Sequence, residues 1–353
     1  MIKLKRSSIK LLPILRGKTD IIYLTLIKEL MDNKEIYKRT LTFSIRQLLW
    51  DLMSFVVIII AAAAGFFLAE QLANVGLVGL AIGVVIGIIV VAIASHFISY
   101  VFKAGQIAMM TKGIAEGKLP DNVYGEGKKI VKERFLTVAA FYAVTSVIKG
   151  IFNELGRAIT AVGQAIGGDN GGAIGGTISG VIQVIVSYLC DCCLGWVFYR
   201  KDENAAKATL QGGVLFFKHG KTLAKNLGRI FGIGILSFVV IGGAFFGISY
   251  LITMAFPGAF EALASEIANI ASEGSEIPDF LTTASSLQLV VSGIAGVVMW
   301  AIIHGTFVRP FILVGVLRNF IESGKDEKFS KADFDKLDSK SKKFKKLHAE
   351  AEA

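Results

Sequence analysis

Six apolar runs, each of about 20 residues, constrain this chain more than any other feature of its sequence. That length is what an α-helix needs to cross a bilayer core about 30 Å thick. The runs lack the alternating apolar and polar pattern of a membrane β-strand. The sequence therefore predicts an all-α integral membrane protein with about six transmembrane helices in three hairpins, near residues 54–72, 77–102, 135–151, 174–199, 230–255 and 287–308.

The positions of lysine and arginine set the expected orientation. Of the 38 basic residues in the chain, 36 lie in four segments: 11 in 1–46, 7 in 103–134, 7 in 200–229 and 11 in 309–353. Basic residues accumulate in loops that stay in the cytoplasm, and six spans put all four segments on one side. We therefore expect both termini inside, and the plasma or inner membrane as the location.

Composition and charge agree with a lipid environment. Hydrophobic residues make up 53% of the chain and charged residues only 19%, whereas soluble domains have roughly 25% charged residues. The net charge of +10 would suggest nucleic acid for a soluble protein. Because the basic residues here lie in loops and tails, we expect them to face anionic lipid headgroups and expect no nucleic-acid partner.

Three segments are expected along the chain. Residues 1–47 form a basic cytoplasmic segment with an amphipathic helix, residues 48–321 the six-span transmembrane domain, and residues 322–353 a charged cytoplasmic tail. The basic cytoplasmic linkers between hairpins are partly apolar and are expected to contain amphipathic helices. Whether those helices lie at the interface or re-enter the membrane is left open.

Few ionisable residues fall inside the apolar runs. His96, Asp191 and His304 come from three different hairpins and each lies close to the cytoplasmic end of its run. Such residues often mark ion pathways or proton relays, so we treat the three as a candidate intramembrane polar site for a proton or cation. The alternative is that each side chain reaches headgroup water or a neighbouring carbonyl.

Rows of glycine predict tight helix packing, because small residues let helix backbones approach closely. One row comprises Gly79, Gly83 and Gly87, and a second comprises Gly172, Gly176 and Gly180. Pro310 follows Arg309 near the end of the last run, and a proline there disturbs the helix about one turn earlier. It is a candidate hinge.

No motif for catalysis, a cofactor or a metal is evident. Cys190, Cys192 and Cys193 cluster in one apolar run, but zinc sites usually need four ligands in two spaced pairs, so we expect no metal there. We expect no cofactor and no enzymatic activity.

The sequence favours a transporter or channel for a small solute or ion. The alternative is a non-catalytic membrane-embedded scaffold or assembly subunit that recruits partners through its linkers and tail. A homo-oligomer or larger membrane complex is left open.

Overall fold

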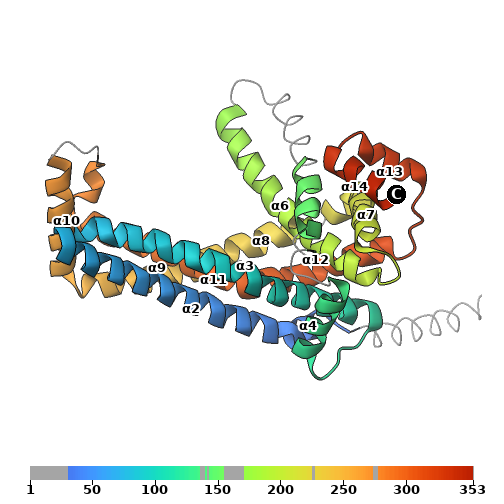
Figure 1. Cartoon of the computed structure of the whole chain (residues 1–353), viewed down its shortest axis with the longest axis horizontal. Helices are drawn as coiled ribbons and strands as arrows, with labels where there is room; N and C mark the ends of the chain where they lie inside the picture. Colours follow the sequence, from blue (N-terminus) through green and yellow to red (C-terminus); the bar gives the residue numbers. More distant parts are fainter. Residues whose placement is uncertain are drawn as a thin grey trace, which may run out of the picture. The chain divides into compact units, whose positions relative to one another are not determined.

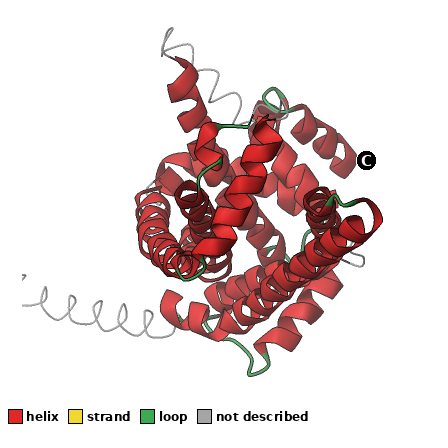
Figure 2. Cartoon of the chain, turned by 90° about the vertical axis from the view of Figure 1, so that its left-hand side faces the viewer, coloured by secondary structure: helices red, strands yellow, loops and turns green. Residues whose placement is uncertain are grey.

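The computed structural model describes residues 31–135, 140, 143–154, 171–224, 227–272 and 277–352. Across these residues the chain forms helices joined by short loops, with no strand (Figure 2). The predicted all-α class is therefore confirmed. The helices fall into two compact units that interleave along the chain (Figure 1). Unit 1 comprises Met1–Phe43, Tyr100–His219 and Val314–Ala353, and unit 2 comprises Ser44–Ser99 and Gly220–Leu313.

Several helices contribute residues to both units. These are α2 (Asn33–Ala73), α3 (Gly76–Glu116), α7 (Ala205–Ala224) and α12 (Arg309–Gly324). Unit 1 also holds a helical segment at 143–154 and four further helices: α4 (Val123–Arg134), α6 (Gly171–Tyr199), α13 (Lys331–Asp338) and α14 (Lys342–Glu352). Unit 2 adds α8 (Leu227–Ser237), η2 (Phe238–Gly242), α9 (Gly243–Met254), α10 (Pro257–Ser272), η3 (Asp279–Leu281), α11 (Ala284–Ile303) and η4 (His304–Val308). The segments η2 and η4 are π-helical, and η3 is a 3₁₀ turn.

The helices α2 and α3 lie side by side (Figure 1), and small residues form their contact in unit 2. A Cβ atom built on Gly79 would overlap the carbonyl oxygen of Gly65, and one built on Gly83 would overlap that of Ala61. A Cβ on Gly87 would lie 3.0 Å from the Ile58 Cα. The first predicted glycine row therefore lies at the α2–α3 contact, where any side chain would separate the helices.

A very short turn joins these two helices. Asn74 adopts the left-handed conformation with φ 52°, which asparagine tolerates better than most residues. The Gly76 N–H then donates to the Glu70 carboxylate at 2.9 Å. At the opposite end of the hairpin the Trp50 indole N–H donates to the Ser95 hydroxyl at 2.9 Å. Both ends are therefore fixed by hydrogen bonds.

A second hairpin in unit 2 pairs α8, η2 and α9 with α11 and η4. Gly296 allows the close approach, because a Cβ there would lie 2.8 Å from the Gly242 carbonyl oxygen. Large apolar side chains on both hairpins are exposed, including Leu251 at 69% and Phe67 at 63%. A water-soluble protein rarely exposes so much contiguous apolar surface, so this pattern fits helices surrounded by lipid.

Within the described residues, four helical stretches are long and apolar enough to cross a membrane: Asn33–Ala73, Gly76–Ser95, Gly228–Met254 and Ala284–Gly324. They contain or overlap the predicted spans at 54–72, 77–102, 230–255 and 287–308. The predicted spans at 135–151 and 174–199 lie partly outside the described residues, so both stay predictions. Of 174–199, the described apolar stretch is Gln183–Tyr199, which is shorter than a span.

The end of α6 lies in the core of unit 1. Trp196 and Val197 of α6 have no exposed surface, and neighbouring residues from Tyr188 onward are buried as well. Gly195 packs against Leu317 of α12, and Gly324 lies against the Trp196 ring. The end of α6 is therefore apolar because other helices of unit 1 cover it.

The remaining helices of unit 1 cover the same core. Phe43, Met109, Leu119 and Val123 form a buried cluster from α2, α3, the loop after α3 and the start of α4. On α7, Ala208, Leu210, Val214 and Leu215 are almost fully buried. The apolar face that the sequence offers on this linker helix thus packs against protein. Two helices, α13 and α14, occupy the predicted tail.

Candidate functional site

A polar cluster in unit 2 centres on Ser237, the last residue of α8. Its hydroxyl oxygen lies 2.9 Å from the His304 Nδ1 and accepts a hydrogen bond from the Trp300 indole N–H at 3.1 Å. Ser237 also donates to the Gly234 carbonyl oxygen at 2.7 Å. Ser237 is only 8% exposed. Three helical segments therefore meet around a buried residue with a polar side chain.

These contacts favour one tautomer of His304. A serine hydroxyl has one hydrogen, and here it is directed to the Gly234 carbonyl. The His304 Nδ1 must then carry a hydrogen and donate it to Ser237, leaving Nε2 as the lone-pair acceptor of a neutral imidazole. Within the described residues Nε2 has no hydrogen-bond partner. The arrangement presents a proton acceptor in helices that are otherwise apolar.

A second polar group lies two residues further along η4. Thr306, 3% exposed, donates its hydroxyl to the Asp51 carboxylate of α2 at 3.3 Å. The other carboxylate oxygen of Asp51 accepts from the Gln47 side-chain amide at 2.7 Å. An acidic side chain in an apolar helix is costly and is usually retained for function. The segment η4 thus carries the imidazole of His304, which contacts Ser237, and the hydroxyl of Thr306, which contacts the Asp51 carboxylate.

Both π-helical segments lie at this cluster. The segment η4 carries His304 and Thr306, and η2 begins directly after Ser237. Phe238 of η2 packs edge to face on Trp300, with ring centroids 5.1 Å apart. A π-helical turn inserts an extra residue into an α-helix and is found frequently at functional sites. The irregular backbone and the polar side chains therefore coincide.

Pro310 lies next to this irregularity, as the second residue of α12. Proline has no backbone N–H and cannot bond to the carbonyl four residues earlier, which is that of Thr306. The helix is π-helical at that turn. The hinge role of Pro310 stays a prediction.

The other two predicted polar residues have different settings. Asp191 belongs to unit 1, is 3% exposed, and its carboxylate forms an ion pair with the Lys103 ammonium at 2.7 Å. This pair ties α6 to α3. His96 belongs to α3 in unit 2, but its side chain lies outside the described residues. The side-chain surroundings of Gly172, Gly176 and Gly180 also lie outside them. The shared site of His96, Asp191 and His304 therefore stays a prediction.

The three cysteines are buried in unit 1. Burial raises the pKa of the Cys193 thiol, and the nearby Cys190 adds to the shift. A thiol held neutral in this way is a poor nucleophile.

Sequence reasoning missed three members of the unit 2 cluster: Asp51, Ser237 and Thr306. Asp51 directly precedes the predicted span 54–72, so it reads as a flanking residue. Ser237 and Thr306 are uncharged and raise no signal in a hydropathy window. The signal that could have found Asp51 is its position in an uninterrupted run of helix-forming residues, since α2 extends well before the apolar window.

No known protein family, curated protein or solved structure matches this chain. What it does must therefore be argued from its own residues.

Proposed function

We propose that this chain is a multi-pass membrane protein that moves a small ion or solute through unit 2 by way of the cluster formed by Asp51, Ser237, His304 and Thr306. The observation that carries the proposal is the polar cluster itself. It comprises two separate contacts of π-helix η4, that of the His304 imidazole with Ser237 and that of Thr306 with the Asp51 carboxylate, within helices that expose aliphatic side chains. Burying such groups in a membrane is costly, and pathways are where they are usually retained.

The proposed topology has four spans, with both termini inside. Residues 47–102 and 230–308 contain no Lys or Arg, and they cover most of unit 2. Of the 38 basic residues, 33 belong to the segments of unit 1. Four spans, like the six first predicted, are an even number and so place both termini on the same side of the membrane. With four, Lys149 and Arg157 also join the cytoplasmic side, as the distribution of basic residues favours.

Proton exchange at His304 supplies a mechanism for this site. With Nδ1–H donating to Ser237, the Nε2 lone pair accepts a proton and later releases it. The Asp51 carboxylate, held by Thr306 and Gln47, supplies negative charge in the same unit for a passing cation. The proposal assigns no cofactor and no enzymatic reaction. The basic surface of unit 1 would face anionic headgroups.

Flux of protons and small cations in proteoliposomes tests this function. The comparison uses the native chain, Ser237→Ala, His304→Gln and Asp51→Asn, with Ser54→Ala as the matched control. Ser54 is buried to a similar extent in α2, but its hydroxyl donates only to the Trp50 carbonyl one turn earlier. We expect at least a tenfold loss of flux in the three site variants and native flux in Ser54→Ala.

Asp191→Asn is unsuitable for this purpose, because it would leave the Lys103 ammonium without its partner and destabilise unit 1. Native protein that gives no proton or cation flux above empty liposomes would overturn the proposed ion pathway. The scaffold alternative would then be favoured, because unit 1 is a well-packed basic domain large enough to hold a partner.

A further inference from the structure

The chain ends in a helical hairpin that is firmly packed on unit 1. The helix α13 begins with a capping box in which Ser330 and Asp333 exchange hydrogen bonds. Leu337 and Phe344 are almost fully buried, and a Cβ on Gly213 of α7 would lie 3.1 Å from the Phe344 ring. Ser341, between the two helices, donates to the Glu154 carboxylate at 2.6 Å. Side chains on this hairpin are therefore held in place.

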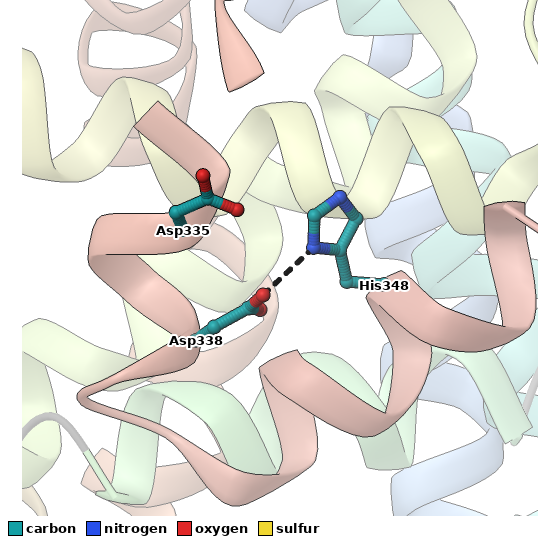
Figure 3. A group of neighbouring side chains, drawn as sticks. All are labelled: Asp335, Asp338 and His348. Carbon is teal, nitrogen blue, oxygen red and sulfur yellow. Dashed lines mark hydrogen bonds and ion pairs between the residues drawn. The ribbon is translucent and has the colours of Figure 1, made fainter. Parts of the chain in front are cut away.

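Three potential metal ligands converge between the two helices (Figure 3). Asp335 and Asp338 lie one turn apart on α13, and His348 projects toward them from α14. One carboxylate oxygen from each aspartate and one ring nitrogen lie within 4.8 Å of one another. The closest pair is the His348 Nδ1 and the Asp338 Oδ2, at 2.9 Å. Only small movements would bring all three to a common ion.

The second carboxylate oxygen of Asp338, Oδ1, is buried and has no hydrogen-bond partner among the described residues. Removing a carboxylate oxygen from water without a partner is costly, so such an atom calls for an explanation. A cation at this position would satisfy it.

The imidazole has the surroundings of a metal ligand. The His348 ring stacks on Phe334, with centroids 5.2 Å apart and an interplanar angle of 28°. Its Nδ1 faces the two aspartates, while its Nε2 lies 3.5 Å from the Glu352 carboxylate. Histidines that bind metals usually donate their second N–H to a carboxylate, which fixes the tautomer and strengthens the ligand. Glu352 is placed for that role.

We propose that Asp335, Asp338 and His348 bind a divalent first-row transition-metal ion such as Zn²⁺ or Mn²⁺. Two carboxylate oxygens and one imidazole nitrogen suit such ions, and water would complete the coordination. When the metal binds Nδ1 of the neutral imidazole, the ring hydrogen moves to Nε2, where the Glu352 carboxylate accepts it, so no net proton is released. The ion would fasten α14 to α13 and so hold the end of the chain on unit 1.

This site differs from the sequence expectation, which included no metal site. That expectation was drawn from the three cysteines. Two aspartates and a distant histidine match no familiar metal motif, and only the turn at Ser339–Lys340 brings them together.

Equilibrium metal binding to the full-length protein in detergent tests the proposal. The protein is stripped with chelator and titrated with Zn²⁺ or Mn²⁺, and bound metal is measured by mass spectrometry. We expect on the order of one equivalent per chain and a metal-dependent rise in Tm. Asp335→Asn, Asp338→Asn and His348→Ala should each weaken binding at least tenfold, and Glu352→Gln by about tenfold.

Asp335→Asn is the decisive variant, because the Asp335 side chain is exposed and its replacement leaves the packing of the hairpin intact. Asp326→Asn makes the same change of charge at another exposed position and should bind metal like the native chain. The absence of saturable binding, or binding that Asp335→Asn leaves unchanged, would overturn the proposal. Neither result bears on transport, because the site belongs to unit 1.

Discussion

At the scale of single residues, Glu203 shows how unit 1 uses its charges. Its carboxylate accepts from Lys207 at 2.7 Å, from Arg200 at 3.0 Å and from the Gln211 amide at 3.2 Å. Gln211 in turn accepts a hydrogen bond from the buried Trp196 indole. The hydrogen bond from Lys207 is the main cause that lowers the pKa of Glu203 below its ordinary value of 4.5.

This shift predicts how stability depends on pH. A carboxyl whose pKa is lower in the folded state stabilises the fold above its unfolded pKa, and that contribution is lost as the pH falls through the folded value. We expect Glu203→Gln to lower the Tm of the protein by roughly 1–3 °C at pH 7, as for a partly exposed ion pair. The difference from the native chain should shrink below about pH 4.5. Thermal unfolding across this range measures it, with Glu133→Gln, whose side chain is 63% exposed, as the control. A difference independent of pH would contradict the electrostatic explanation.

At the scale of helices, the α2–α3 contact gives a sharp comparison between two glycines. A methyl group on Gly83 would overlap the Ala61 carbonyl, whereas one on Gly243 would meet no atom within 4 Å. We expect Gly83→Ala to destabilise the protein by about 1–3 kcal/mol, the usual cost of overpacking. Gly243→Ala should be neutral or slightly stabilising, because alanine favours a helix. Thermal unfolding in detergent distinguishes them, and equal Tm values would contradict this contact.

Sequence reasoning located the four apolar helical stretches that, within the described ranges, are long enough to cross a membrane. A hydropathy window reports that residues avoid water, and it cannot distinguish lipid from protein as their surroundings. In the predicted span 174–199, for example, the window does not reveal that Trp196 and Val197 are buried among other helices. A hydropathy window also does not detect the polar part of a helix. The helix α2 begins at Asn33, well before its apolar part. Asp51 and the π-helical segments depend on tertiary contacts, which one sequence does not reveal.

At the scale of the whole molecule, Lys149 distinguishes four spans from six. Six spans put this exposed residue near the outer surface, and four keep it in the cytoplasm. We expect Lys149→Cys to resist a membrane-impermeant maleimide in intact cells and to react after permeabilisation. Glu261→Cys on α10 should react in intact cells. The native cysteines are buried, so the native chain sets the background. Labelling of Lys149→Cys from outside would favour six spans.

The short α2–α3 connection affects how the chain is made. The helix α2 ends at Ala73 and α3 begins at Gly76, so only Asn74 and Val75 separate them. In the proposed topology, no soluble loop is synthesised between the two apolar segments. They would leave the translocation channel as a preassembled pair, with the glycine contact already formed. Only a two-residue turn would then need to be exported at this point, and insertion of the first hairpin would require no folding on the far side of the membrane.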